Sequence, residues 1–88
     1  MFILLDKFHY ERIGIYDSYE EALNKAIEIS KIPWNIPPNK APCTNWKKCG
    51  REYVIVERIK KNNKSLKVSE VDIFNISSNG VIWHVEFK

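Results

Sequence analysis

Glycine, histidine and cysteine are scarce in this chain, and their scarcity excludes several kinds of site. The 88 residues include three glycines, two histidines and two cysteines. The glycines stand alone at positions 14, 50 and 80, so no glycine-rich loop is available to cradle a phosphate group. No run approaches the roughly 20 apolar residues of a membrane span, and the apolar residues 1–5 are too few for a secretory signal. We therefore expect a cytoplasmic protein that does not enter a membrane.

The spacing of the cysteines and histidines argues against metal and thiol chemistry. Cys43 and Cys49 have five residues between them, whereas structural zinc sites use closer Cys-x2–4-Cys pairs. His9 and His84 are far apart in the chain, and neither is placed by sequence beside a cysteine as a catalytic base. We expect no cofactor, no metal and no enzymatic activity. The thiols are expected to be free in a reducing compartment, while secretion would favour a disulfide.

What the chain does contain is typical of one small folded domain. Hydrophobic residues make up 44% and charged residues 28%, values that argue against disorder. We assign residues 1–88 to a single domain. A chain of this length buries one modest core, so a surface groove or flat binding face is easier to build than an enclosed active site.

The first third of the chain predicts a β-hairpin followed by a helix. Residues 2–5 form a short apolar run and residues 12–16 alternate, as two paired strands would. Ser18 and Glu21 have the spacing of a capping box, so we expect a helix from this point to about Lys31, before Pro33. Its apolar stripe is expected to contain Tyr19, Ala22, Leu23, Ala26 and Ile27.

The last third predicts three more strands. Residues 52–59 are rich in β-branched side chains, a second strand lies within residues 66–77 and is clearest at 71–76, and residues 81–87 alternate. Residues 60–65 are read as a polar turn region, and Asn79-Gly80 indicates a type I′ hairpin turn. The expected fold is α+β: one amphipathic helix on a mostly antiparallel sheet of four to five strands, in the order β-β-α-β-β-β, with a long ordered Pro/Trp/Cys loop after the helix.

One face of this sheet would be left without a helix. We expect this face to be half apolar and to be covered by the long loop. The residues expected on it are Val54, Val56, Arg58, Asp72, Phe74, Ile82, His84 and Glu86.

The loop of residues 32–50 is the segment most suggestive of function. It contains all four prolines, both cysteines and two of the three tryptophans, without a strand or helix period. Residues 33–65 also carry eight basic residues against two acidic ones, whereas the rest of the chain is slightly acidic. Long connections of this kind are often functional, and a basic surface favours an anionic partner.

We therefore expect a non-catalytic binding domain that uses the 33–51 loop. The leading hypothesis is a protein–protein interaction module, by analogy of class with small immunity proteins and phage-encoded inhibitors. The alternative is RNA or single-stranded nucleic-acid binding, because the loop mixes cations with aromatic rings. The candidate binding residues are Trp34, Lys40, Trp46, Lys47, Lys48, Arg51 and Tyr53.

Overall fold

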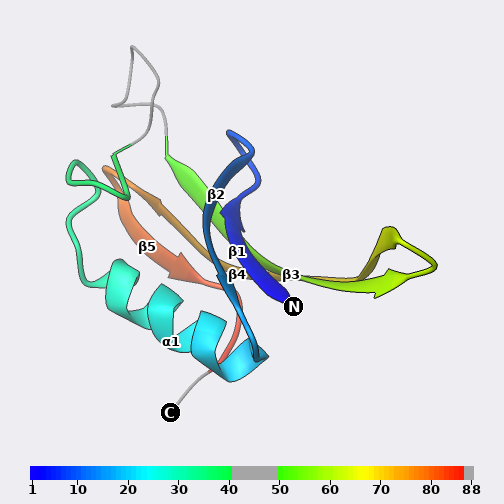
Figure 1. The fold of residues 1–88 in the computed structure, drawn as a ribbon. Helices are drawn as coiled ribbons and strands as arrows, with labels where there is room; N and C mark the ends of the chain where they lie inside the picture. Colours follow the sequence, from blue (N-terminus) through cyan, green and yellow to red (C-terminus); the bar gives the residue numbers. More distant parts are fainter. Residues whose placement is uncertain (41–49, 87–88) are drawn as a thin grey trace.

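The computed structural model describes residues 1–40 and 50–86 and shows a five-stranded antiparallel sheet with one helix on one face (Figure 1). The strands pair in the order β2-β1-β3-β4-β5. The predicted α+β class and the element order β-β-α-β-β-β are confirmed. The elements are β1 (Phe2–Asp6), β2 (Glu11–Tyr16), α1 (Tyr19–Ser30), β3 (Arg51–Lys61), β4 (Lys64–Ser77) and β5 (Gly80–Trp83).

Helix α1 begins as its sequence predicts. The Ser18 hydroxyl accepts a hydrogen bond from the Glu21 amide at 3.1 Å, and the Glu21 carboxylate accepts from the Ser18 amide at 3.2 Å. This reciprocal capping box satisfies two amides that the helix itself leaves unpaired. The fully buried positions of the helix are Ala22, Ala26 and Ile29. Ile29, rather than the predicted Ile27, completes the buried stripe, since it lies seven residues after Ala22 on the same face.

The core lies between α1 and the sheet and is dominated by two central strands. Tyr53 and Ile55 of β3 and Ile73 and Phe74 of the neighbouring β4 belong to the same buried cluster as the apolar residues of α1. Tyr53 and Phe74 are cross-strand partners whose rings lie 4.8 Å apart. Aromatic pairs of this kind supply much of the stabilising area in a small domain.

The prediction that Phe74 faces away from the helix was wrong. In the β3–β4 pairing Tyr53 is opposite Phe74 but Val54 is opposite Asp72, so Ile73 is an extra residue in β4. Such a β-bulge breaks the alternation of side chains, and one inserted residue moves the next side chain to the other face. Ile73 and Phe74 are both fully buried in the core as a result.

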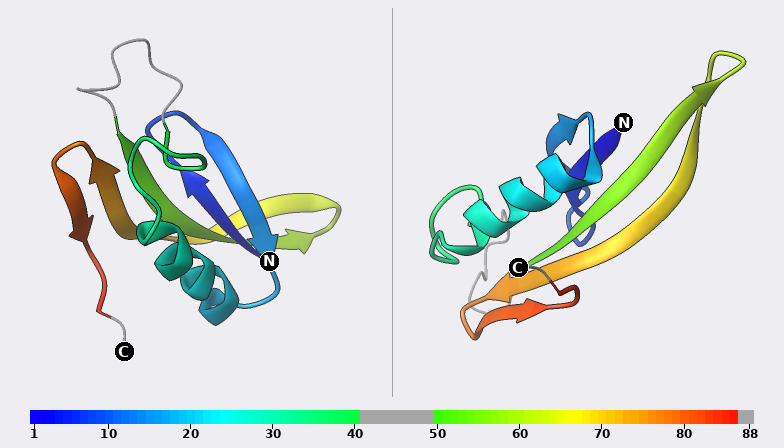
Figure 2. Two further views of the ribbon diagram at one scale, coloured as in Figure 1. Left: turned by 90° about the vertical axis from the view of Figure 1, so that its left-hand side faces the viewer. Right: turned by 90° about the horizontal axis from the view of Figure 1, so that it is seen from below.

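Strands β3 and β4 were predicted, but they extend to Lys61 and from Lys64, so the predicted turn region of residues 60–65 is mostly strand. They extend past the end of β1 as a two-stranded ribbon, which projects from the rest of the molecule in Figures 1 and 2. The turn consists of Asn62 and Asn63, with φ of 53° and 65°. Two successive left-handed residues are the mark of a type I′ turn, and asparagine adopts this conformation more readily than most residues. We call residues 58–68 the arm.

The second hairpin turn differs from its prediction. Strand pairing closes at Ser77 and Gly80, and of the turn residues only Gly80 has a positive φ, at 109°. A type I′ turn would need positive φ at both Ser78 and Asn79. A turn followed by a left-handed glycine belongs instead to the three-residue hairpin loops.

The described part of the long loop, residues 31–40, lies against the end of α1. Asn39 is buried and donates to the carbonyls of Ile29 and Ile32 at 3.0 and 2.8 Å. Its side-chain oxygen accepts from the Tyr53 hydroxyl at 2.8 Å. One asparagine therefore ties the loop to the helix and to the sheet, while the rest of the predicted ordered loop, residues 41–49, lies outside the described residues.

Candidate functional site

The structure separates the residues that the sequence grouped into one binding loop. Trp46, Lys47 and Lys48 lie outside the described residues, so their role stays a prediction. Trp34 is half-buried and packs against the core, and Lys40 is exposed. Only these two of the described candidates have side chains at or near the surface.

Arg51 was predicted as a surface contact, but its side chain is buried and 4% exposed. Its guanidinium donates to Asp6 at 3.0 Å, to Glu11 at 2.9 Å and to the carbonyl of Lys40 at 2.8 Å. Burial alone would lower the pKa of Arg51, but the hydrogen bonds to Glu11 and Asp6 outweigh it and raise the pKa. Arg51 therefore has a structural role, because it joins three segments of the chain from within.

Asp6 is the centre of this buried network. One carboxylate oxygen accepts from the Phe8 and Glu52 amides at 3.0 and 2.9 Å. The other is 3.0 Å from Arg51 and 2.6 Å from Nδ1 of His9. A buried carboxylate is tolerated when its lone pairs are filled in this way. The network fixes the β1–β2 turn, residues 7–10, on the sheet.

Tyr53 was likewise predicted as a contact residue, but it is 1% exposed and forms part of the core. Burial raises the pKa of its hydroxyl, which donates to Asn39. Neither Arg51 nor Tyr53 can meet a partner from these positions, so we remove both from the proposed contact surface.

The arm is the most strongly basic feature of the described residues. It contains Arg58 and four lysines, at positions 60, 61, 64 and 67, and no acidic residue. Every residue from 59 to 68 is exposed. Within the described part of the chain only Lys67 of these five cations forms an ion pair, with Glu70 at 3.0 Å. The arm therefore presents concentrated positive charge at a distance from the body of the protein.

The pairing of the arm places like charges opposite each other. Arg58 faces Lys67, and Lys61 faces Lys64. Between them Lys60 faces Ser65 on the same side of the ribbon as Arg58 and Lys67. Like charges directly opposite in a sheet destabilise it, so this arrangement does not serve the stability of the hairpin.

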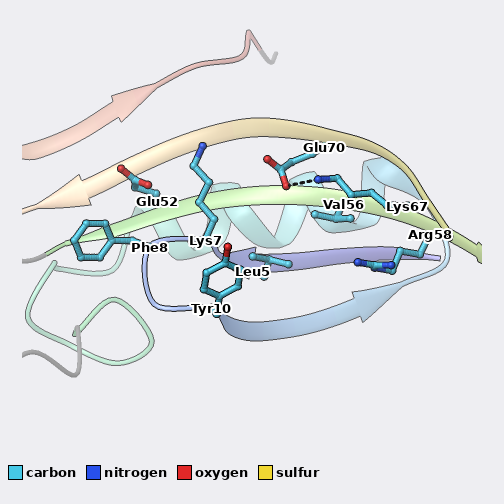
Figure 3. Close-up of a pocket in the computed structure, with 9 residues that line it drawn as sticks. All are labelled: Leu5, Lys7, Phe8, Tyr10, Glu52, Val56, Arg58, Lys67 and Glu70. Atoms are coloured by element: carbon cyan, nitrogen blue, oxygen red, sulfur yellow. Dashed lines mark hydrogen bonds and ion pairs between the residues drawn. The ribbon is translucent and has the colours of Figure 1, made fainter. Parts of the chain in front are cut away.

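A groove of about 520 Å³ lies on the face of the sheet opposite α1 (Figure 3). Arg58 and Lys67, at the base of the arm, line one end, and Phe8 and Tyr10 of the β1–β2 turn line it as well. The remaining lining residues are Leu5, Lys7, Glu52, Val56 and Glu70. The groove is thus continuous with the basic side of the arm.

The charges inside the groove are mostly neutralised. Lys67 pairs with Glu70, and Lys7 donates to Asp72 at 2.9 Å. This hydrogen bond to Asp72 raises the pKa of Lys7, so the lysine is charged at neutral pH. Positive potential therefore comes chiefly from the arm and its base, rather than from the middle of the groove.

Several residues predicted on this open face do lie there. Val56 and Arg58 line the groove, Asp72 pairs with Lys7, and Ile82 lines an adjoining hollow of about 200 Å³. The loop was expected to cover this face. Residues 33–40 line neither hollow and pack beside the helix instead, so they leave the face open, and of the described loop residues only Gly50 lines the smaller hollow.

Sequence reasoning missed both the arm and the aromatic turn. The excess of lysine was counted, but it was attributed to the loop rather than to residues 58–67. The signal available was the run of five cations without an acid around the Asn62-Asn63 pair. The exposure of Phe8 and Tyr10 carried no signal, since both fall in the connection between the predicted strands at 2–5 and 12–16.

Within residues 1–40 and 50–86 there is no cluster of three or more side chains that could hold a metal ion. The one helix of these residues is too short and too polar to cross a membrane. Comparisons of the chain with protein-family models, curated proteins and solved structures find no match.

Proposed function

We propose that this protein is a non-catalytic nucleic-acid-binding domain and that the arm is its main contact element. The observation that carries the proposal is the five cations of the arm, two pairs of which lie directly opposite each other with no acidic residue between them. A cytoplasmic location, as expected from the sequence, goes with this proposal.

The energetics of the arm support a role outside the fold. An isolated two-stranded ribbon is marginally stable in water, and opposed like charges lower its stability further. Ordinary cross-strand pairs of opposite charge would have stabilised it by about 0.2–1 kcal/mol each. A bound polyanion would remove the repulsion, because its phosphates would lie between the lysines. Binding would also release the counterions that are condensed on the nucleic acid, which favours the complex.

The shape of the arm suits a nucleic acid. A two-stranded β-ribbon is narrow enough to enter the major groove of a duplex or to lie along a phosphate backbone. Ile59 and Leu66, opposite each other on the second side of the ribbon, are both 43% exposed and add an apolar surface. Phosphate contacts from the lysines would supply most of the affinity and little sequence preference.

The test is a salt titration of binding to a labelled 20-nucleotide oligonucleotide, single-stranded and duplex, by fluorescence anisotropy. With three or more phosphates contacted, log K should fall with log salt with a slope of about −2 to −4. The variant Lys60→Glu/Lys61→Glu should weaken binding at least tenfold and flatten the slope by about 1–2.

The matched control is Arg12→Glu/Lys31→Glu, which makes the same change in net charge at exposed positions outside the arm. It should change affinity by less than about threefold. Equal losses of affinity in both variants would show that only net charge matters and that the arm is not the contact element. The absence of binding at 50 mM salt would contradict the proposal as a whole. Binding of an acidic protein without any oligonucleotide binding would also contradict it.

Protein binding by the loop is a second candidate, supported by a separate observation. Trp34 and Pro33 line an apolar hollow of about 270 Å³ with Val81, and Ile36 beside them is 48% exposed. Apolar hollows with a tryptophan on the rim are typical of protein contacts. If this candidate holds, Ile36→Asp or Trp46→Ala should abolish capture of a partner in a pull-down. Ile15→Asp, at an equally exposed isoleucine on β2, should leave it unchanged.

A further inference from the structure

Two exposed aromatic rings mark the edge of the open-face groove. Phe8 is 56% exposed and Tyr10 is 89% exposed, although both lie on a short turn held firmly by the Asp6 network. Figure 3 shows the two rings on the β1–β2 turn beside the groove that leads to Arg58 and Lys67. Rigidly held and solvent-exposed rings are the usual platform on which proteins stack unpaired bases.

The backbone of Tyr10 makes the exposure of its ring more informative. Its φ is 54°, a left-handed conformation that glycine and asparagine adopt far more readily than tyrosine. Since the ring is almost wholly exposed, its burial contributes too little stability to offset this backbone strain. Strained residues of this kind cluster at functional sites, so the side chain at position 10 is better explained by a ligand than by the fold.

The lining of the groove distinguishes places for phosphates and places for bases. Arg58 has no ion-pair partner among the described residues and continues into the row of cations on the arm, which suits phosphates. Glu52, beside Phe8, and Glu70, which also pairs with Lys67, present carboxylates, which repel phosphates but accept hydrogen bonds from the amino groups of bases. The volume of the groove falls in the range of small-ligand pockets, roughly 300–1,000 Å³, and admits single bases but not a duplex.

We propose that the open-face groove binds an unpaired segment of a nucleic-acid strand. Bases stack on Tyr10 and Phe8, and the phosphates of the same strand run past Arg58 onto the arm. This inference rests on the proposed function and makes it narrower. The arm alone would bind single strands and duplexes alike, whereas the groove makes the protein prefer a single strand or the junction between a single strand and a duplex.

The experiment compares the affinity of single-stranded and duplex oligonucleotides of the same length for three variants. Tyr10→Asn removes the ring and suits the left-handed backbone, so the fold is kept. It should weaken single-strand binding about 5- to 100-fold and change duplex binding less than twofold. Tyr10→Phe keeps the ring and should retain wild-type affinity. Ile15→Asn, at another exposed apolar residue of the same hairpin, is the control and should leave both affinities unchanged.

The outcomes separate this inference from the proposed function. If Tyr10→Asn leaves single-strand affinity unchanged while Lys60→Glu/Lys61→Glu still lowers it, the stacking groove is wrong and the arm stands. If Tyr10→Asn weakens single-strand and duplex binding equally, the ring does not read unpaired bases and the inference is overturned. If neither variant changes any affinity, both proposals fail.

Discussion

Lys61 and Lys64 lie directly opposite each other on β3 and β4, on either side of the Asn62-Asn63 turn. Both side chains are exposed, and neither has an acidic partner among the described residues. The repulsion between these two lysines lowers the stability of the arm at its tip. This pair offers a test that separates folding from binding.

We predict that Lys61→Glu stabilises the arm and weakens nucleic-acid binding. The change replaces a repulsive cross-strand pair by an attractive one, for a gain of about 0.5 kcal/mol. Amide hydrogen exchange of residues 58–67 should slow about twofold, while oligonucleotide affinity at low salt falls. Lys31→Glu on the helix end should affect neither quantity. Faster exchange of the arm in Lys61→Glu would show that the like-charged pair is not a source of strain.

Tyr10→Asn should raise the free energy of unfolding by about 0.5–1 kcal/mol. Asparagine tolerates the positive φ of this position better than tyrosine does. The tyrosine ring is 89% exposed, so its removal costs little buried apolar area. Urea unfolding followed by tryptophan fluorescence measures the change, with Tyr10→Phe as the variant expected to match wild type. A loss of stability would mean that the ring makes a contact important to the fold.

Asn39 should be among the most sensitive polar positions of the described chain. Asn39→Ala removes one hydrogen bond each from the carbonyls of Ile29 and Ile32 and from the hydroxyl of Tyr53. The Ile29 carbonyl keeps the Ile32 amide at 3.0 Å, and the Tyr53 hydroxyl keeps only a long bond of 3.4 Å to the Pro38 carbonyl. We expect a loss of about 2–4 kcal/mol, because each buried group that is left unpaired costs about 1–3 kcal/mol before relaxation. The control is Asn35→Ala, at an exposed asparagine of the same loop, with an expected effect below about 0.5 kcal/mol. Similar effects of the two substitutions would contradict the anchoring role.

Stability should fall in alkaline solution because of Tyr53. Its pKa is raised by burial above the ordinary value of 10.0, so the unfolded chain releases this proton at a lower pH than the folded one. The stabilisation is complete below about pH 10 and is lost as pH rises toward the folded pKa. Urea unfolding between pH 8 and 11 should show this loss. Tyr53→Phe should be less stable at pH 8, having lost its bond to Asn39, but should depend less on pH above 10.

The elements that could be predicted from the sequence were those with local causes. Ser18 and Glu21 are three residues apart, so the start of α1 can be predicted without tertiary structure. The side of the sheet on which Phe74 lies could not be predicted, because the bulge at Ile73 depends on pairing with β3. The length of the arm was hidden for a different reason. Its exposed polar residues carry no alternation, and an Asn-Asn turn is a weaker signal than Asn-Gly.

The candidate site was harder to predict than the fold. Arg51 follows a basic segment and looks like a surface cation in the sequence. It is buried because its acidic partners, Asp6 and Glu11, come from the other end of the chain. Conversely, the five cations of the arm come together only when β3 and β4 pair across the turn, which puts three of them on one side of the ribbon and two on the other. Contacts between distant segments therefore decide which charges are available to a partner.

An NMR titration of the isotope-labelled protein with a short single-stranded oligonucleotide at 50 mM salt tests whether the arm and the β1–β2 turn bind the strand. We expect the largest amide shifts in the arm, residues 58–68, and in the turn that carries Phe8 and Tyr10. The shifts should weaken together as salt is raised. Shifts confined to helix α1 or to the loop after it, or no shifts at all, would contradict binding by the arm and the turn.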